Sequence, residues 1–333
     1  MARTGQVAAG FAVSIVLWAT APVAAGAEPI FADGFESGGT CGWGFGTVTC
    51  PGFQIQTPEV ELAPGEESTW CYYFLTPNVG TLSIRRWTST FGPAVHDAIL
   101  YTTYDNDWDP AERQPPGTLT QSPCGFAAGG GWAAWTYAAY AAVGELVLPG
   151  DDGAGAPLAV EMAAGQPAFL RMHFINATDQ TVTGSVVLGA EALAPAVAYT
   201  KTATYQTYNG SLSIPPGAIG DTETQTCAVP ADIEFWRLST HTHRNAIEAK
   251  IRDGATTLVV TNDWENPAVT SYASPGFYAF SASGLTYECT YNNSGASTIT
   301  TGDSDLFDEN CVAIGYFFPA TRPMICYNSI GPL

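Results

Sequence analysis

The sequence is poor in basic residues, with 11 Lys and Arg against 31 Asp and Glu, and its only lysines are Lys201 and Lys250. No basic stripe is available to neutralise phosphates, so we expect no nucleic-acid partner. The acidic balance, with a formal net charge of −20, favours solubility. Low charge density with many Thr, Ser, Gly and aromatic residues is typical of exported β proteins.

The sequence also has no Cys-x-x-Cys pair, which argues against a zinc knuckle or a redox dithiol. Its eight cysteines are an even number, and in an exported protein such a count favours four disulfides over thiolate metal sites.

Long apolar runs are scarce, and we find one only between Val7 and Ala25, after the basic start Met1-Ala2-Arg3. A basic start, an apolar middle and a small-residue exit predict a signal peptide over residues 1–27. The alternative, a membrane anchor, is disfavoured because Ser14, Thr20 and Pro22 interrupt the run. No later stretch is long enough to span a bilayer. We therefore expect an exported protein, secreted or periplasmic, that leaves the membrane after cleavage and acts as a monomer.

Helical periodicity is scarce as well, and short β-rich runs alternate with Gly, Pro and Asn or Asp, which predicts an all-β fold of sandwiches. We expect a Gly-rich N-terminal segment over 28–58, a first domain over 59–195 and a second over 196–333, with a hinge at 190–197. The stretch 129–143 is rich in Ala and Gly, and we predict a loop or a short helix there.

The chain has four histidines: His96, His173, His241 and His243. In a strand, residues i and i+2 face the same side, so His241 and His243 can converge on one ion. His173 lies in an alternating run, on the face of Phe169 and Arg171. Imidazole suits copper, zinc, iron or nickel. Taken one at a time, however, such histidines are more often surface or hydrogen-bonded structural residues.

The order of five short motifs resembles the copper type II, ascorbate-dependent monooxygenases, the family of peptidylglycine- and dopamine-hydroxylating enzymes. The similarity covers roughly residues 66–330 and uses every histidine of the chain. The five motifs are Thr69-Trp70-Cys71-Tyr72-Tyr73-Phe74, Ala94-Val95-His96-Asp97-Ala98-Ile99-Leu100-Tyr101, Leu170-Arg171-Met172-His173-Phe174, His241-Thr242-His243, and Asp308-Glu309-Asn310-Cys311 with the aromatic run that follows it.

The resemblance implies two tandem, antiparallel, jelly-roll-like β-sandwich domains, each with one copper facing a wet cleft, so up to two ions per chain. The first copper stores an electron, the second binds dioxygen and hydroxylates a C–H bond, and ascorbate reduces both. The implied metal ligands are His96 and His173 in the first domain and His241, His243 and Asn310 in the second. The implied disulfides are Cys71–Cys124, Cys227–Cys326 and Cys289–Cys311, which leaves Cys41–Cys50 as a local pair that the resemblance does not supply.

Each site departs from the family pattern at one ligand. Val95 replaces a first-domain histidine, and Asn310 replaces the second-domain methionine. A thioether is a soft ligand that favours Cu(I), whereas an amide oxygen is harder, so the reduced state should be weakened. Asp97 could substitute in the first domain, but as the strand neighbour of His96 we expect it to point to the opposite face.

The substrate-binding positions differ too. Ser239 replaces the arginine that clamps a carboxylate in the peptidylglycine enzymes, and Val312 and Ile314 replace their asparagine and tyrosine. A C-terminal peptide substrate is therefore disfavoured.

These observations predict an exported copper-dependent monooxygenase-like protein that hydroxylates a C–H bond of an unknown small-molecule substrate with dioxygen and ascorbate. One alternative is a catalytically impaired copper-binding protein on the same scaffold. Another is a structural or adhesive exported module in which the histidines have lost their metal-binding role.

Overall fold

The structure is a computed structural model that describes residues 51–103, 114–121, 133–302, 304 and 306–331. The predicted signal peptide, most of the Gly-rich N-terminal segment and the proposed Cys41–Cys50 pair lie outside these residues. The described secondary structure consists of β-strands, so the predicted all-β class is confirmed. Within the described residues, no helix is long and apolar enough to cross a membrane.

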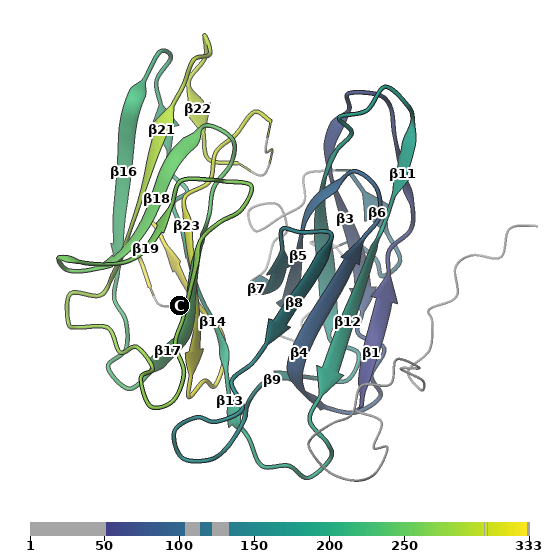
Figure 1. Cartoon of the computed structure of the whole chain (residues 1–333), viewed down its shortest axis with the longest axis vertical. Helices are drawn as coiled ribbons and strands as arrows, with labels where there is room; N and C mark the ends of the chain where they lie inside the picture. The colour runs from purple at the N-terminus through teal and green to yellow at the C-terminus, as the bar shows by residue number, and fades with distance from the viewer. Residues whose placement is uncertain (1–50, 104–113, 122–132, 303, 305, 332–333) are drawn as a thin grey trace, which may run out of the picture.

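The N-terminal sandwich consists of two sheets (Figure 1). Its outer sheet has the order β1-β12-β4-β9-β13, with β8 also paired to β4. These strands are β1 (Gly52–Gln56), β12 (Val186–Ala192), β4 (Leu82–Phe91), β9 (Leu158–Met162), β13 (Thr200–Lys201) and β8 (Val143–Val147). Its inner sheet has the order β6-β3-β10-β5-β7. These strands are β6 (Leu119–Thr120), β3 (Glu67–Leu75), β10 (Pro167–Ile175), β5 (Val95–Thr103) and β7 (Ala133–Ala139).

The C-terminal sandwich also consists of two sheets (Figure 1). Its inner sheet has the order β20-β17-β23-β14-β24. These strands are β20 (Val269–Ser271), β17 (Glu234–His241), β23 (Val312–Phe318), β14 (Ala203–Tyr208) and β24 (Met324–Tyr327). Its outer sheet has the order β16-β21-β18-β19. These strands are β16 (Ile219–Cys227), β21 (Leu285–Asn292), β18 (Ala246–Asp253) and β19 (Thr256–Thr261).

The two sandwiches share one topology. The strand order β3-β10-β5-β7 in the first corresponds to β16-β21-β18-β19 in the second, and β1-β12-β4-β9 corresponds to β14-β23-β17-β20. Each sandwich also carries a small two-stranded sheet, β2 (Val60–Leu62) with β11 (Val182–Gly184) in the first and β15 (Ser213–Ile214) with β22 (Ile299–Thr300) in the second. The chain therefore folds as two tandem sandwiches of the same design.

Alternation along β10 explains how one strand serves both a core and a site. Leu170, Met172 and Phe174 are fully buried and join the hydrophobic core of the first sandwich. The intervening residues Arg171 and His173 point from the other face of the inner sheet, as the period of two requires. That face is turned toward the second sandwich (Figure 1).

Two sequence-based expectations about elements need correction. Residues 133–139, which we predicted as loop or short helix, form strand β7, because they pair with residues 98–103 of β5. Residues 52–56, which we placed in the Gly-rich N-terminal segment, form β1 and pair with β12.

The two inner sheets pack face to face. One continuous cluster of buried apolar side chains contains Trp135 and Tyr137 of the first sandwich together with Trp236, Ile314 and Tyr316 of the second. Polar contacts cross the same interface, since the Trp135 backbone N–H donates to Gln206 Oε1 (3.2 Å). A buried apolar interface of this kind holds two domains in a fixed relation.

Two disulfides close the second sandwich, Cys227–Cys326 and Cys289–Cys311, and both match the pairing that the resemblance implied. Cys71 is disulfide-bonded as well. Its expected partner Cys124 lies outside the described residues.

Candidate metal sites

The structure brings His241, His243 and Asn310 together. His241 is the last residue of β17, His243 follows two positions later, and Asn310 precedes the neighbouring strand β23, where Val312 pairs with His241. The ring centroids of His241 and His243 are 5.3 Å apart. Asn310 Nδ2 lies 2.8 Å from His243 Nε2. All three predicted second-domain ligands thus converge on one place.

Hydrogen bonds fix the orientation of His243. Its Nδ1 lies 3.1 Å from the Asp308 carbonyl oxygen, which can only accept, so Nδ1 carries the proton. Nε2 is then the unprotonated nitrogen, which accepts from Asn310 Nδ2 here and would bind a metal in place of that hydrogen bond. The Glu309 carboxylate accepts the backbone N–H of His243 (3.0 Å) and of Asn245 (2.6 Å). Burial raises the pKa of Glu309 above its usual value.

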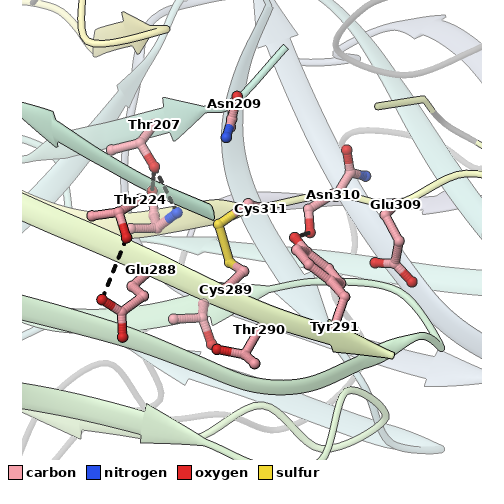
Figure 2. Close-up of a disulfide and its surroundings, with 12 residues drawn as sticks. Thr207, Asn209, Thr224, Glu288, Cys289, Thr290, Tyr291, Glu309, Asn310 and Cys311 are labelled. Atoms are coloured by element: carbon pink, nitrogen blue, oxygen red, sulfur yellow. Dashed lines mark hydrogen bonds between the residues drawn. A yellow bond between two sulfur atoms is a disulfide. The ribbon is translucent and has the colours of Figure 1, made fainter. Parts of the chain in front are cut away.

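The Cys289–Cys311 disulfide and Tyr291 hold Asn310 in place. Figure 2 shows the disulfide bond directly after Asn310, with the Tyr291 hydroxyl directed at the Asn310 backbone, to which it donates a hydrogen bond of 2.8 Å. Burial raises the pKa of Tyr291 well above its usual value, so it remains a neutral donor. The backbone of this candidate ligand is therefore anchored to β21.

The donor set of this site fits copper, and its amide ligand favours the oxidised state. Among the described residues, Asn310 Oδ1 is buried and has no hydrogen-bond partner, as expected of an oxygen atom that a cation would satisfy. Two imidazoles accept either copper oxidation state, but an amide oxygen is harder than the family's thioether and favours Cu(II).

Two aromatic residues of the first sandwich reach His241. The Tyr140 hydroxyl lies 3.1 Å from His241 Nδ1, and the Trp135 ring lies edge-on to the imidazole at 5.3 Å between centroids. Burial raises the pKa of Tyr140 well above its usual value, so its hydroxyl remains protonated. The second-domain site is therefore completed by the first domain.

In the first domain, the structure contradicts our expectation for Asp97. In the register of β10 with β5, Asp97 pairs with His173 and Val95 pairs with Phe174, so His96 is an extra residue in a β-bulge. A bulge breaks the alternation of side chains. His96 and Asp97 therefore both reach the face of His173, while Val95 lies opposite the core residue Phe174.

The Asp97 carboxylate lies between the two imidazoles. Its Oδ2 atom is 3.0 Å from His96 Nδ1 and 3.3 Å from His173 Nδ1, and its Oδ1 atom is 3.4 Å from Arg171 Nη1. Burial alone would raise the pKa of Asp97, but the hydrogen bonds with His173 and His96 hold it well below its usual range. Asp97 is therefore a buried, charged carboxylate.

A second carboxylate, Glu67, joins this site to the other domain. Its Oε1 atom lies 3.1 Å from His173 Nε2, and its other oxygen forms an ion pair with Arg244, the residue after His243. The hydrogen bond with His173 lowers the pKa of Glu67. The second sandwich also places Trp264 against His96, with ring centroids 5.1 Å apart. Both sites thus lie at the domain interface.

The positions that form the substrate pocket in the peptidylglycine enzymes have other roles here. Ser239 Oγ donates to the Ala268 carbonyl oxygen (3.0 Å), and Val312 and Ile314 are buried in the interface cluster. The resemblance implied a wet cleft between the domains. Among the described residues around His241, aromatic and aliphatic side chains instead pack across the interface.

Trp135, Tyr140 and Glu67 were not predicted as site residues from the sequence, and Asp97 was predicted on the wrong face of its strand. Trp135 and Tyr140 lie in or next to a strand that we had predicted as loop or helix, and only the packing of the two sandwiches brings them to His241. Glu67 precedes the first motif of the resemblance and carries no pattern of its own.

Comparison with known proteins gives one family match. Residues 202–333 match the family model "Copper type II ascorbate-dependent monooxygenase, C-terminal domain". A search of curated proteins found no match.

The chain is also similar to solved structures, at low scores. They include the naturally empty particles of cowpea mosaic virus (8% identity, TM-score 0.29, covering 81% of this chain and 94% of that one). The major capsid protein P2 of bacteriophage PM2 matches with 8% identity and a TM-score of 0.27, covering 79% and 97%. The exported protein XepA of PBSX matches with 12% identity and a TM-score of 0.18, covering 79% and 86%. Scores of this size carry no argument about function.

The matched segment contains β14 to β24 and the convergent His241, His243 and Asn310. The second sandwich, residues 202–333, therefore matches the C-terminal domain of the copper type II ascorbate-dependent monooxygenases.

Proposed function

We propose that this protein is an exported, copper-dependent monooxygenase that hydroxylates a C–H bond of a small molecule with dioxygen and ascorbate. The observation that carries the proposal is the convergence of His241, His243 and Asn310 in the segment that matches the family. Copper, when bound there, supplies the redox chemistry of the reaction.

The surrounding residues have defined tasks in this proposal. The Asp308 carbonyl holds the proton of His243 on Nδ1, so that Nε2 is presented to the metal. The Tyr140 hydroxyl, if it accepts the Nδ1 proton of His241, orients the second imidazole in the same way. Trp135 covers His241 and shields this side of the site from water.

The substrate class follows from what lines the site. Ser239 donates to a backbone carbonyl, and Val312 and Ile314 are buried. The positions that bind a peptide carboxylate in the peptidylglycine enzymes therefore have no positively charged side chain here. The aromatic and aliphatic surroundings of His241 favour a small apolar or aromatic substrate without a carboxylate.

The test uses the full mature chain reconstituted with copper. It is incubated with ascorbate, ¹⁸O-labelled dioxygen and a panel of small aromatic and aliphatic compounds, and mass spectrometry detects products that contain one labelled oxygen atom. We expect labelled product from the wild type and none from His243→Gln, with folding checked by circular dichroism. Equal labelling in both proteins would reflect free copper and ascorbate, and would reject the proposal.

A second candidate function is copper binding without turnover. It is favoured by Asn310, because a hard ligand in place of the thioether disfavours the reduced copper that must react with dioxygen. In that case the wild type binds copper at His241 and His243 with the same stoichiometry, yet the labelling experiment gives no product from any member of the panel.

A further inference from the structure

The first-domain histidines present the same nitrogen to one carboxylate oxygen. Nδ1 of His96 and Nδ1 of His173 both face Asp97 Oδ2, at 3.0 and 3.3 Å. The outer nitrogens face other carboxylates, since His173 Nε2 is 3.1 Å from Glu67 Oε1 and His96 Nε2 is 3.8 Å from Glu265 Oε1. A carboxylate that holds the outer N–H of an imidazole, as Glu67 does for His173, is typical of metal-binding histidines, whereas Glu265 is too far from His96 for a hydrogen bond.

The spacing of the inner atoms agrees with a shared ion. Metal–ligand bonds of about 2.1 Å place neighbouring ligand atoms about 3.0 Å apart in an octahedron and about 3.4 Å apart in a tetrahedron. The two separations from Asp97 Oδ2 fall within this interval. The three candidate ligand atoms of His96, Asp97 and His173 all lie within 4.8 Å of one another.

The rest of the site leaves one oxygen of Asp97 for an ion. Arg171 lies 3.4 Å from Oδ1, so it neutralises the oxygen that the imidazoles do not face. Both Arg171 and Asp97 are nearly fully buried, whereas the side chain of His96 is 17% exposed and gives an ion a route of entry. Glu67, Asp97 and Glu265 outnumber the nearby guanidiniums of Arg171 and Arg244, which favours a cation.

We propose that His96, His173 and Asp97 form a two-histidine, one-carboxylate site for a divalent cation such as Zn²⁺, Fe²⁺ or Cu²⁺. These three ligands do not fit the copper site that the family resemblance implied for this domain, in which every protein ligand is an imidazole. A carboxylate is a hard ligand, so the site disfavours Cu(I) and does not cycle between copper oxidation states as an electron store does. The two-histidine, one-carboxylate set is instead one that divalent iron and zinc use.

Protons on the two imidazoles are the alternative to a metal ion between His96, His173 and Asp97. Without an ion, the same distances fit hydrogen bonds from the two imidazoles to Asp97, and the cluster would be an ionic network of structural value. A bound metal would differ from this proton network because it displaces the protons between His96, His173 and Asp97. The spectrum of the metal would then change when any of these three residues is replaced.

The experiment titrates the wild type, Asp97→Asn and His96→Ala with Co²⁺ and Zn²⁺, in the full mature chain. The visible spectrum of bound Co²⁺ reports its coordination, and Zn²⁺ competition gives the affinity. Asp232→Asn, at an exposed aspartate, is the matched control. We expect one Co²⁺ band that Asp97→Asn and His96→Ala remove, with Zn²⁺ affinity reduced at least about 100-fold, and that the control retains.

Unchanged Co²⁺ spectra in both variants would overturn the proposal, and so would tighter binding of Cu(I) than of Zn²⁺ at this site. His96→Ala keeps the test decisive if Asp97→Asn fails to fold, because His96 is partly exposed. The inference does not rest on the proposed function, since the two sites share no ligand. Loss of Co²⁺ at His96 and loss of copper at His243 are separate outcomes.

Discussion

Replacing Asn310 by Met restores the thioether of the family pattern and tests what the amide does. The two side chains have the same number of heavy atoms. Removing the buried Asn310 Oδ1 that lacks a partner gains about 1–3 kcal/mol, while losing the hydrogen bond to His243 costs about 0.5–1.5 kcal/mol. The net change lies between a loss of about 0.5 and a gain of about 2.5 kcal/mol, so the metal-free protein should melt within several degrees of the wild type.

Against this nearly constant stability, Cu(I) affinity should rise at least about tenfold, or about 1.4 kcal/mol, because a soft ligand replaces a hard one. Cu(I) affinity is measured anaerobically by competition with a coloured Cu(I) chelator, and Cu(II) affinity by competition with a Cu(II) chelator. Asn262→Met, at an exposed asparagine, is the control for a surface thioether. An unchanged Cu(I) affinity, or a rise that the control also shows, would refute the assignment of Asn310 as a ligand.

Three further predictions concern the interface and the second sandwich. Tyr140→Phe should lower stability by about 0.5–1.5 kcal/mol and change the electron paramagnetic resonance of Cu(II) bound by His241, because it removes a contact of 3.1 Å; an unchanged spectrum would contradict it. Replacing Cys289 and Cys311 by Ala should cost about 3 kcal/mol in chemical denaturation, since it opens a loop with a sequence separation of 22. Burial would raise the pKa of Asp253, but hydrogen bonds from Ser281 and Tyr278 bring it below its ordinary value of 3.8. Asp253→Asn should therefore cost about 1–3 kcal/mol at pH 7, and its deficit should shrink as the pH falls below about 4, where the wild type loses the same stabilisation; a deficit independent of pH would argue against this role.

The second-domain site could be predicted from the sequence because its geometry is local. His241 and His243 are two residues apart on one strand, and the alternation of side chains is enough to bring their imidazoles together. Alternation also placed His173 on the face opposite Leu170 and Phe174, as the structure confirms. Asn310 came from the resemblance, and the pairing of β17 with β23 accounts for its position.

The first-domain site could not be predicted fully, because it depends on a departure from regular structure. The alternation rule would separate His96 from Asp97, and a β-bulge, which has no sequence signal here, brings them to the same face. Trp135 and Tyr140 were missed for another reason. Their role at His241 arises only when the two inner sheets pack together, and that is a property of the whole fold.

An anaerobic Cu(I) titration of the mature protein, with the bound ions counted per chain, tests whether copper binds only in the second domain. If His241 and His243 hold the copper and His96, His173 and Asp97 form a site for divalent cations, the wild type binds one Cu(I). His96→Ala still binds one, and His243→Gln binds none. Two Cu(I) ions in the wild type, or loss of Cu(I) in His96→Ala rather than in His243→Gln, would contradict this account.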